Sequence, residues 1–204
     1  NKRKKSDCTL IESSFFKRKN IPLMAIIIPL ILLITNCIIS NLTKIIIIMD
    51  TLSHALYGKG LFGYKKYRWF SFLFGAIPDL FSFGIYFVYL FLFSDFEFGR
   101  PSRDELPLWV FDLYDISHSM ITALVFIAIA YKINKDFAWP MLAWPMHIIV
   151  DFFTHSIEFF PTPIFWPVSD FRFDGIPWSN PYVLGINFIL IFIIFFYRWK
   201  IKKP

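Results

Sequence analysis

Three ionisable residues recur at four-residue intervals in the apolar stretch WPMHIIVDFFTHSIEFF: His147, Asp151 and His155. In a helix, this spacing places all three on one narrow stripe. Imidazole and carboxylate groups are the usual ligands of zinc and related divalent ions. The pattern therefore indicates a metal site. A set of interhelical hydrogen bonds without metal and a proton or ion path are the two alternatives.

Similar residues stand in three other segments of the chain. Asp79 follows Pro78 in GAIPDLFS, His118 lies in FDLYDISHSM, and His54 lies in MDTLSHALYG, so all four histidines belong to the set. A proline inside a helix removes a hydrogen bond and bends the helix, which can turn the Asp79 carboxylate toward a neighbouring imidazole. The predicted metal ligands are His54, Asp79, His118, His147 and Asp151.

A divalent ion at such a site would balance the charge of the carboxylates. It would also lower the pKa of bound water to about 7, which suits attack on an ester or phosphoester. Asp115 is the predicted general base, although it could instead be a ligand or orient His118. Asp50 is either a helix N-cap or a ligand. His155 either contacts substrate or simply lies at the membrane interface.

The elements that must position these groups are predicted to be membrane helices. Of the 204 residues 56% are hydrophobic and only 18% charged, and several apolar runs approach the roughly 20 residues needed to cross a bilayer. We predict an all-α, multi-pass transmembrane helical bundle. Its four or so spans are Trp69–Phe93, Leu108–Tyr131, Phe137–Phe160 and Tyr182–Tyr197.

The candidate ligands fall at a common depth in these predicted spans. Asp79, His118, His147 and Asp151 lie roughly 11 to 15 residues from the same membrane face, which at about 1.5 Å per residue is a slab of about 6 Å. A charge at that depth costs at least about 2.5–3.5 kcal/mol, so it needs a partner. A shared cation supplies one.

Basic residues set the expected orientation in the membrane. Lysines and arginines gather before the first span, after the second and after the fourth, whereas the opposite loops hold only Arg100, Arg103 and Arg172. The positive-inside rule then places both ends of this unit, including the C-terminus, in the cytoplasm, and we expect the inner (cell) membrane. Because the basic residues flank apolar runs, the net charge of +6 does not indicate a nucleic-acid partner. The partner is the lipid bilayer.

The first 48 residues differ from the rest. They form an extension with a basic start and an apolar run over residues 21–40, which could be an extra N-terminal signal-anchor helix, a surface-lying helix, or sequence upstream of the true start at Met49. The metal-site domain is then residues 49–204. Cys8 and Cys37 lack ligand-like spacing, and no disulfide framework is predicted.

From Met49 onward the chain resembles a known family. MDTLSHALYG, GAIPDL, SHSMITAL, HIIVDFFTH and PTPIFWPVSDFRF, in this order, are similar to motifs of the membrane-bound metal-dependent hydrolases described as LexA-binding, inner-membrane-associated hydrolases. A more distant likeness is to zinc-dependent phospholipase C, an all-helical enzyme. That likeness implies His54, Asp79, His118, His147 and Asp151 as ligands, with Asp151 able to bridge two ions.

The chain also departs from this pattern. Many relatives carry HRG ahead of THS, whereas here Leu113 stands at the position of that histidine and Asp115 at that of the glycine. The number of ions is therefore not implied. The resulting hypothesis is a membrane-bound, zinc-dependent hydrolase of an ester or phosphoester, with a lipid as one substrate. The rival is a non-enzymatic membrane protein, either a metal or proton carrier or a structural bundle.

Overall fold

The chain is represented by a computed structural model that describes residues 50–93 and 103–201. The predicted extension over residues 1–48, with its possible extra helix, lies outside the described residues. Within them the fold is all-α and contains no strand, in agreement with the predicted class.

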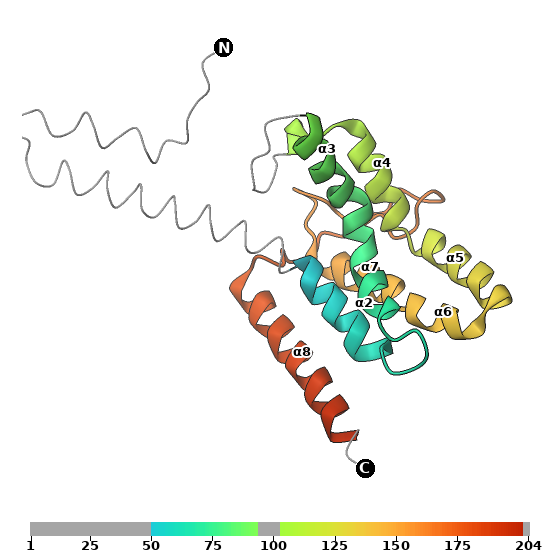
Figure 1. The fold of residues 1–204 in the computed structure, drawn as a ribbon. Helices are drawn as coiled ribbons and strands as arrows, with labels where there is room; N and C mark the ends of the chain where they lie inside the picture. Colours follow the sequence, from blue (N-terminus) through green and yellow to red (C-terminus); the bar gives the residue numbers. More distant parts are fainter. Residues whose placement is uncertain (1–49, 94–102, 202–204) are drawn as a thin grey trace, which may run out of the picture. The chain divides into compact units, whose positions relative to one another are not determined.

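The described elements are joined by short connections up to α7, whereas the irregular segment over residues 155–180 separates α7 from α8 (Figure 1). They are a helix over residues 50–62, α2 (Phe70–Asp79), a π-helical turn (Leu80–Gly84), α3 (Ile85–Phe93), a 3₁₀ turn (Arg103–Glu105), α4 (Leu108–Ser117), α5 (Met120–Ile133), α6 (Lys135–Met141), α7 (Ala143–Thr154) and α8 (Pro181–Ile201).

Two of these helices are long and apolar enough to cross a membrane, fewer than the four or so predicted. One is the continuous helix Phe70–Phe93, which comprises α2, the π-helical turn and α3, and the other is α8. The pair α4–α5, which is bent by 54°, would add a third if the two halves form one span. The predicted span 137–160 is wrong, because it is divided into α6 and α7. Pro145 has no N–H for the carbonyl of Met141, which weakens the helical hydrogen bonding where α6 ends and α7 begins.

Side-chain caps mark where the shorter helices begin. The Asn134 side chain accepts hydrogen bonds from the backbone N–H groups of Asp136 and Phe137 at the start of α6. Ser119 accepts one from the N–H of Thr122 at the start of α5. Both satisfy N–H groups that the first turn of a helix leaves without partners.

The interior of the bundle is built around α7, which lies behind α2 in Figure 1. One apolar cluster, with Tyr114 at its centre, packs between α3, α4 and the segment after α7. A second joins Phe74 of α2 to Met141 and Ala143. Polar side chains are buried among these clusters, whereas large apolar side chains such as Phe91, Phe93 and Phe192 are exposed on the outside. That distribution is compatible with association with a membrane.

An irregular segment over residues 155–180 closes the end of α7. The N–H groups of Gly175, Ile176 and Trp178 donate to the carbonyls of His155, Phe153 and Thr154. These bonds satisfy carbonyls that a helix C-terminus leaves open. A Cβ at Gly175 would lie 2.5 Å from the carbonyl oxygen of Phe153, so the close approach requires glycine.

Candidate metal centre

Asp79 lies where the helical hydrogen bonding of α2 changes to the π-helical turn. Pro78 precedes it, and the Pro78 carbonyl accepts hydrogen bonds from the hydroxyls of Ser82 at 3.0 Å and Ser117 at 3.1 Å. Thr51 donates to Oδ2 of Asp79 at 2.7 Å. Oδ1 is thereby left to face the histidines. Single π turns of this kind are frequent at functional sites.

His118 lies at the break between α4 and α5. Its backbone leaves the helical conformation, and the carbonyl of Ser117 at the break accepts from the indole N–H of Trp144 at 2.7 Å. The Met120 N–H donates to the carbonyl of Ile164, so the segment after α7 also fixes this corner. The imidazole is completely buried and stacks on the ring of Tyr114.

His147 and Asp151 lie one turn apart on the buried face of α7. Nδ1 of His147 is 2.7 Å from the carbonyl oxygen of Gly75 in α2. A Cβ at Gly75 would lie 2.4 Å from the carbonyl oxygen of His54, so glycine is needed where α2 crosses the 50–62 helix. The same crossing therefore provides the acceptor for His147.

These partners fix the tautomers of the two central histidines. Nδ1 of His147 faces the Gly75 carbonyl and Nδ1 of His118 faces the Tyr114 carbonyl at 3.2 Å, so each Nδ1 donates its proton. Each neutral ring then presents a lone pair at Nε2. The two Nε2 atoms nevertheless lie only 3.2 Å apart. A cation shared between them, either a proton on one ring or a metal ion, removes the repulsion of the two lone pairs.

Four such atoms form what we call the first cluster: Oδ1 of Asp79, Nε2 of His118, Nε2 of His147 and Oδ2 of Asp151. Five of their separations are 3.2, 3.3, 3.0, 3.6 and 3.7 Å. Tetrahedral ligands at the usual zinc distance of about 2.0–2.1 Å are about 3.3 Å apart. The first cluster therefore has the dimensions of a tetrahedral metal site.

A second cluster adjoins the first through the other oxygen of Asp151. It consists of Asp50, Asp151 and His155, whose ligand atoms lie within 4.8 Å of one another. Nε2 of His155 is 3.6 Å from Oδ2 of Asp50 and 3.7 Å from Oδ1 of Asp151. Its Nδ1 is held by the Phe160 carbonyl and the Tyr114 hydroxyl, both at 2.9 Å.

His54 lies beside the second cluster. Its Nε2 is 2.8 Å from Oδ1 of Asp151 and 3.3 Å from Oδ1 of Asp50. Its ring contacts that of His147, with centroids 3.9 Å apart. The predicted residue is thus next to the ligands of both clusters.

Several of these atoms are buried and, among the described residues, have no partner besides the opposing imidazoles and carboxylates of the clusters. They include both carboxylate oxygens of Asp151, both ring nitrogens of His54 and Nε2 of His155. Leaving buried polar atoms unpaired costs about 1–3 kcal/mol each, more when they are charged. The unpaired atoms converge on the two clusters. A divalent ion fits this donor set, so the buried Asp and His group could hold metal.

The carboxylates also affect the histidines outside the candidate spans. Burial alone would lower the pKa of His155, but the negative charges of Asp151 and Asp50 outweigh it and raise the pKa to about 9. Burial opposes the charged form of His54 as well, and the same two carboxylates still raise its pKa well above the ordinary value. Each cluster therefore attracts positive charge, and metal binding would release protons.

Asp115, the predicted general base, has a different partner. Its two oxygens accept hydrogen bonds from the guanidinium of Arg172, each at 3.1 Å, and Arg172 also donates to the carbonyl of Pro161. Asp115 belongs to neither cluster. This pairing ties the segment after α7 to α4, and the role in proton transfer stays a prediction.

The other predicted residues are brought together. Asp79, His118, His147 and Asp151 meet in the first cluster, and His54 borders the second. Asp50 and His155, for which the sequence left two interpretations each, are in the second cluster. Thr51, Gly75 and Tyr114 hold the ligands in place but were not predicted. Thr51 lies beside the candidate ligand Asp50 in the sequence, and this adjacency could have indicated a residue that supports the site.

Comparisons with known proteins add no relative. No family model, curated protein or solved structure is significantly similar to this chain. The geometry of the two clusters is therefore the main evidence on function.

Proposed function

We propose that this chain is a membrane-bound, metal-dependent hydrolase of an ester or phosphoester. The main support is the first cluster, in which two imidazole lone pairs and two carboxylate oxygens lie 3.0–3.7 Å from one another in five of their pairings. The resemblance of the sequence to inner-membrane hydrolases points to the same activity. Inner-membrane location and a cytoplasmic C-terminus are part of this proposal.

Zinc is the proposed ion. Mixed imidazole and carboxylate ligands in tetrahedral geometry suit zinc, while oxygen-only octahedral sites suit magnesium or calcium. Asp79, His118, His147 and Asp151 would hold one ion, and Asp50, Asp151 and His155 a second, with Asp151 shared. The ions would supply Lewis acidity and lower the pKa of a coordinated water.

The residues around the clusters would control the reaction. Phe159 and Trp178 line a cavity beside the second cluster and give it apolar walls. Asp50 is the most exposed carboxylate of the two clusters, at 17% of its side chain, so it is the best placed to exchange a proton with substrate. Arg172 and Asp115 would hold the irregular segment over residues 155–180 in position against α4.

The cavity also separates this proposal from its rival. A carrier requires polar residues along a path on both sides of its ion site. The cavity instead has aromatic and aliphatic walls, with Asp50, Thr51, Asp79 and His155 as its polar groups. This mostly apolar cavity suits an enzyme that acts on a membrane-embedded substrate, and a second cavity, lined in part by Asp50, His54 and Asn187, borders the clusters from the side of α8.

Elemental analysis of the purified protein tests the proposal. The wild type should contain zinc in stoichiometric amount and hydrolyse p-nitrophenyl esters or bis(p-nitrophenyl) phosphate. His147→Ala should lose both metal and activity. Asp112→Asn, which alters an exposed carboxylate on α4, is the matched control and should lose neither. A metal-free wild type whose stability is unchanged by His147→Ala would leave only the hydrogen-bonded bundle.

A further inference from the structure

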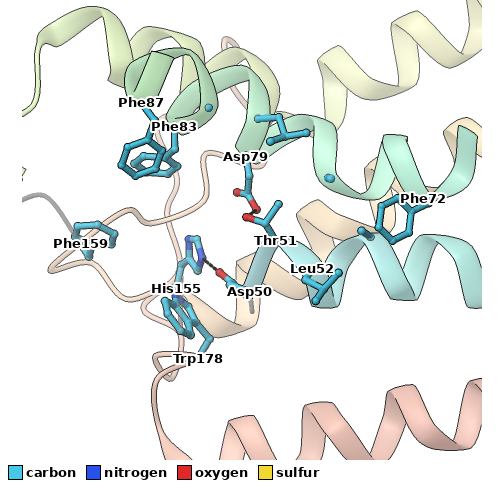
Figure 2. A pocket seen from close by; sticks show the side chains of 14 residues that line it. Asp50, Thr51, Leu52, Phe72, Asp79, Phe83, Phe87, His155, Phe159 and Trp178 are labelled. Atoms are coloured by element: carbon cyan, nitrogen blue, oxygen red, sulfur yellow. Dashed lines mark hydrogen bonds and ion pairs between the residues drawn. The ribbon is translucent and has the colours of Figure 1, made fainter. Parts of the chain in front are cut away.

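The cavity beside the clusters has a volume of about 350 Å³, within the range of small-molecule sites. It runs between the 50–62 helix, α2 with its π-helical turn, and the segment after α7. Figure 2 shows Asp50, Asp79 and His155 pointing into its middle. Phe72 lies to one side of them, and Phe83, Phe87 and Phe159 lie to the other.

Apolar walls on both sides of a reactive centre imply a ligand that is apolar at both ends. Burying a methylene group is worth about 0.8 kcal/mol, so hydrocarbon in each part of the cavity would contribute to binding. The bond to be cleaved would lie in the middle, against the clusters. A substrate with a charged headgroup would place that charge against phenylalanine.

Charge leads to the same conclusion. Among the described residues no lysine or arginine lines the cavity, so a phosphoryl group would have only the proposed metal ions to balance its charge. Asp50, Asp79 and Asp151 together carry three negative charges against two proposed dications. The remaining charge of +1 would leave a phosphomonoester dianion unbalanced, whereas it is enough to polarise a neutral carbonyl group.

We infer that the substrate is an uncharged lipid carboxylic ester, with one hydrocarbon chain on each side of the ester bond. This inference rests on the proposed function and narrows it. Hydrolysis adds one water molecule: its OH joins the acyl carbon, the bond from that carbon to the alcohol oxygen breaks, and the alcohol oxygen receives the remaining proton. The products are a fatty acid and a fatty alcohol or acylglycerol.

Gly84 provides a direct test because it lines the cavity in the π-helical turn. A Cβ at this position would lie 3.4 Å from the Leu80 side chain and 4.0 Å from the backbone oxygen of Asp79, both ordinary contacts. Gly84→Leu should therefore fold and fill part of the cavity. Gly185→Leu, on α8 where a Cβ meets nothing within 4 Å, is the matched control.

The experiment compares zinc content and the hydrolysis of p-nitrophenyl palmitate, p-nitrophenyl acetate and bis(p-nitrophenyl) phosphate. We expect the wild type to prefer palmitate. Gly84→Leu should lower kcat/KM for palmitate about tenfold, as expected for two displaced methylene groups, with acetate hydrolysis and zinc unchanged. Gly185→Leu should change none of these values.

The outcomes separate this inference from the proposed function. A zinc-loaded wild type that cleaves the phosphodiester but no ester would overturn the inference and keep the hydrolase. A wild type with neither zinc nor hydrolysis would overturn both. If Gly84→Leu does not fold, photolabelling of the wild type with a diazirine-bearing fatty ester decides: labelling of residues 83–87 that excess unlabelled ester removes supports the inference, and its absence refutes it.

Discussion

The two helices that could cross a membrane are alike in hydropathy and differ in burial and in the regularity of their hydrogen bonding. Phe70–Phe93 has a mean hydropathy of 1.8 and α8 one of 1.9. In the most apolar window of the first, 28% of residues are buried in the protein, whereas none are in that of α8. The first helix contains a proline, a π-helical turn and Asp79, and α8 is regular throughout. Hydropathy identifies a span, while its irregularities show where chemistry can be placed.

The contrast extends to what each helix contacts. Helix α2 contributes a carboxylate to the first cluster and the carbonyl that orients His147. Helix α8 is joined to the 50–62 helix by Asn187, which donates to Ser53 at 2.8 Å, and by Arg198, which donates to the carbonyls of Gly60 and Leu61. We therefore expect changes in α2 to affect metal binding and changes in α8 to affect stability only.

The largest effect is expected at the carboxylates. Asp79→Ala should lower the affinity of the first cluster for its ion by more than about 100-fold, since even the loss of a residue that only supports a ligand lowers metal affinity by about 10–100-fold. Asp151→Ala should lose both ions. Asn187→Ala, the corresponding polar residue of α8, should keep both. Elemental analysis measures all three, and equal metal loss in Asn187→Ala would abolish the distinction between the helices.

Removal of the metal should loosen one helix and not the other. A bound ion at 100 times its dissociation constant stabilises the fold by about 2.7 kcal/mol, so a chelator should lower Tm by roughly 5–10 °C. Hydrogen exchange should increase in residues 70–84 and stay constant in α8. The same protein reloaded with zinc is the control. Uniform exchange along both helices would argue against an ion held by α2.

Two glycine substitutions compare packing on the two helices. Gly75→Ala places a Cβ 2.4 Å from the carbonyl oxygen of His54 and should destabilise by about 1–3 kcal/mol. Gly185→Ala meets no atom within 4 Å and should stabilise by up to about 1 kcal/mol. Thermal unfolding in detergent measures both. A tolerated Gly75→Ala would show that the crossing of α2 and the 50–62 helix is looser than described.

The smallest effects are expected from single hydroxyls. Ser117→Ala removes a hydrogen bond to the Pro78 carbonyl, and Ser53→Ala removes the one from Asn187. Each should cost about 0.6 kcal/mol. Only Ser117→Ala should also weaken zinc binding, since Pro78 adjoins Asp79. Zinc titration of the two variants would refute this expectation if their affinities were the same.

The sequence predicted the centre of the site better than the number of spans. His147 and Asp151 share a helical stripe whatever surrounds them, and the depth of Asp79 and His118 follows from counting residues. The span count was wrong because hydropathy does not register the missing N–H of Pro145, which helps divide residues 137–160 into α6 and α7.

Asp115 and His155 show why single-helix spacing was not enough. Asp115 was predicted to act as a general base, as a ligand or by orienting His118, but the helix breaks at His118 and the two side chains have different partners. His155 lies beyond the last residue of α7, and its ring is placed by Tyr114 and Phe160. Such long-range contacts are not encoded in local periodicity.

The sharing of Asp151 has a consequence for proteins that resemble this one. Each of its oxygens faces a different cluster, and within residues 50–93 and 103–201 it is the one residue common to both. A chain that preserved every helix but had a neutral side chain at position 151 would retain the architecture and lose its means of holding either ion. If the proposed function holds, that one position offers a simple marker for telling chains that can bind both ions from scaffolds of the same shape that cannot.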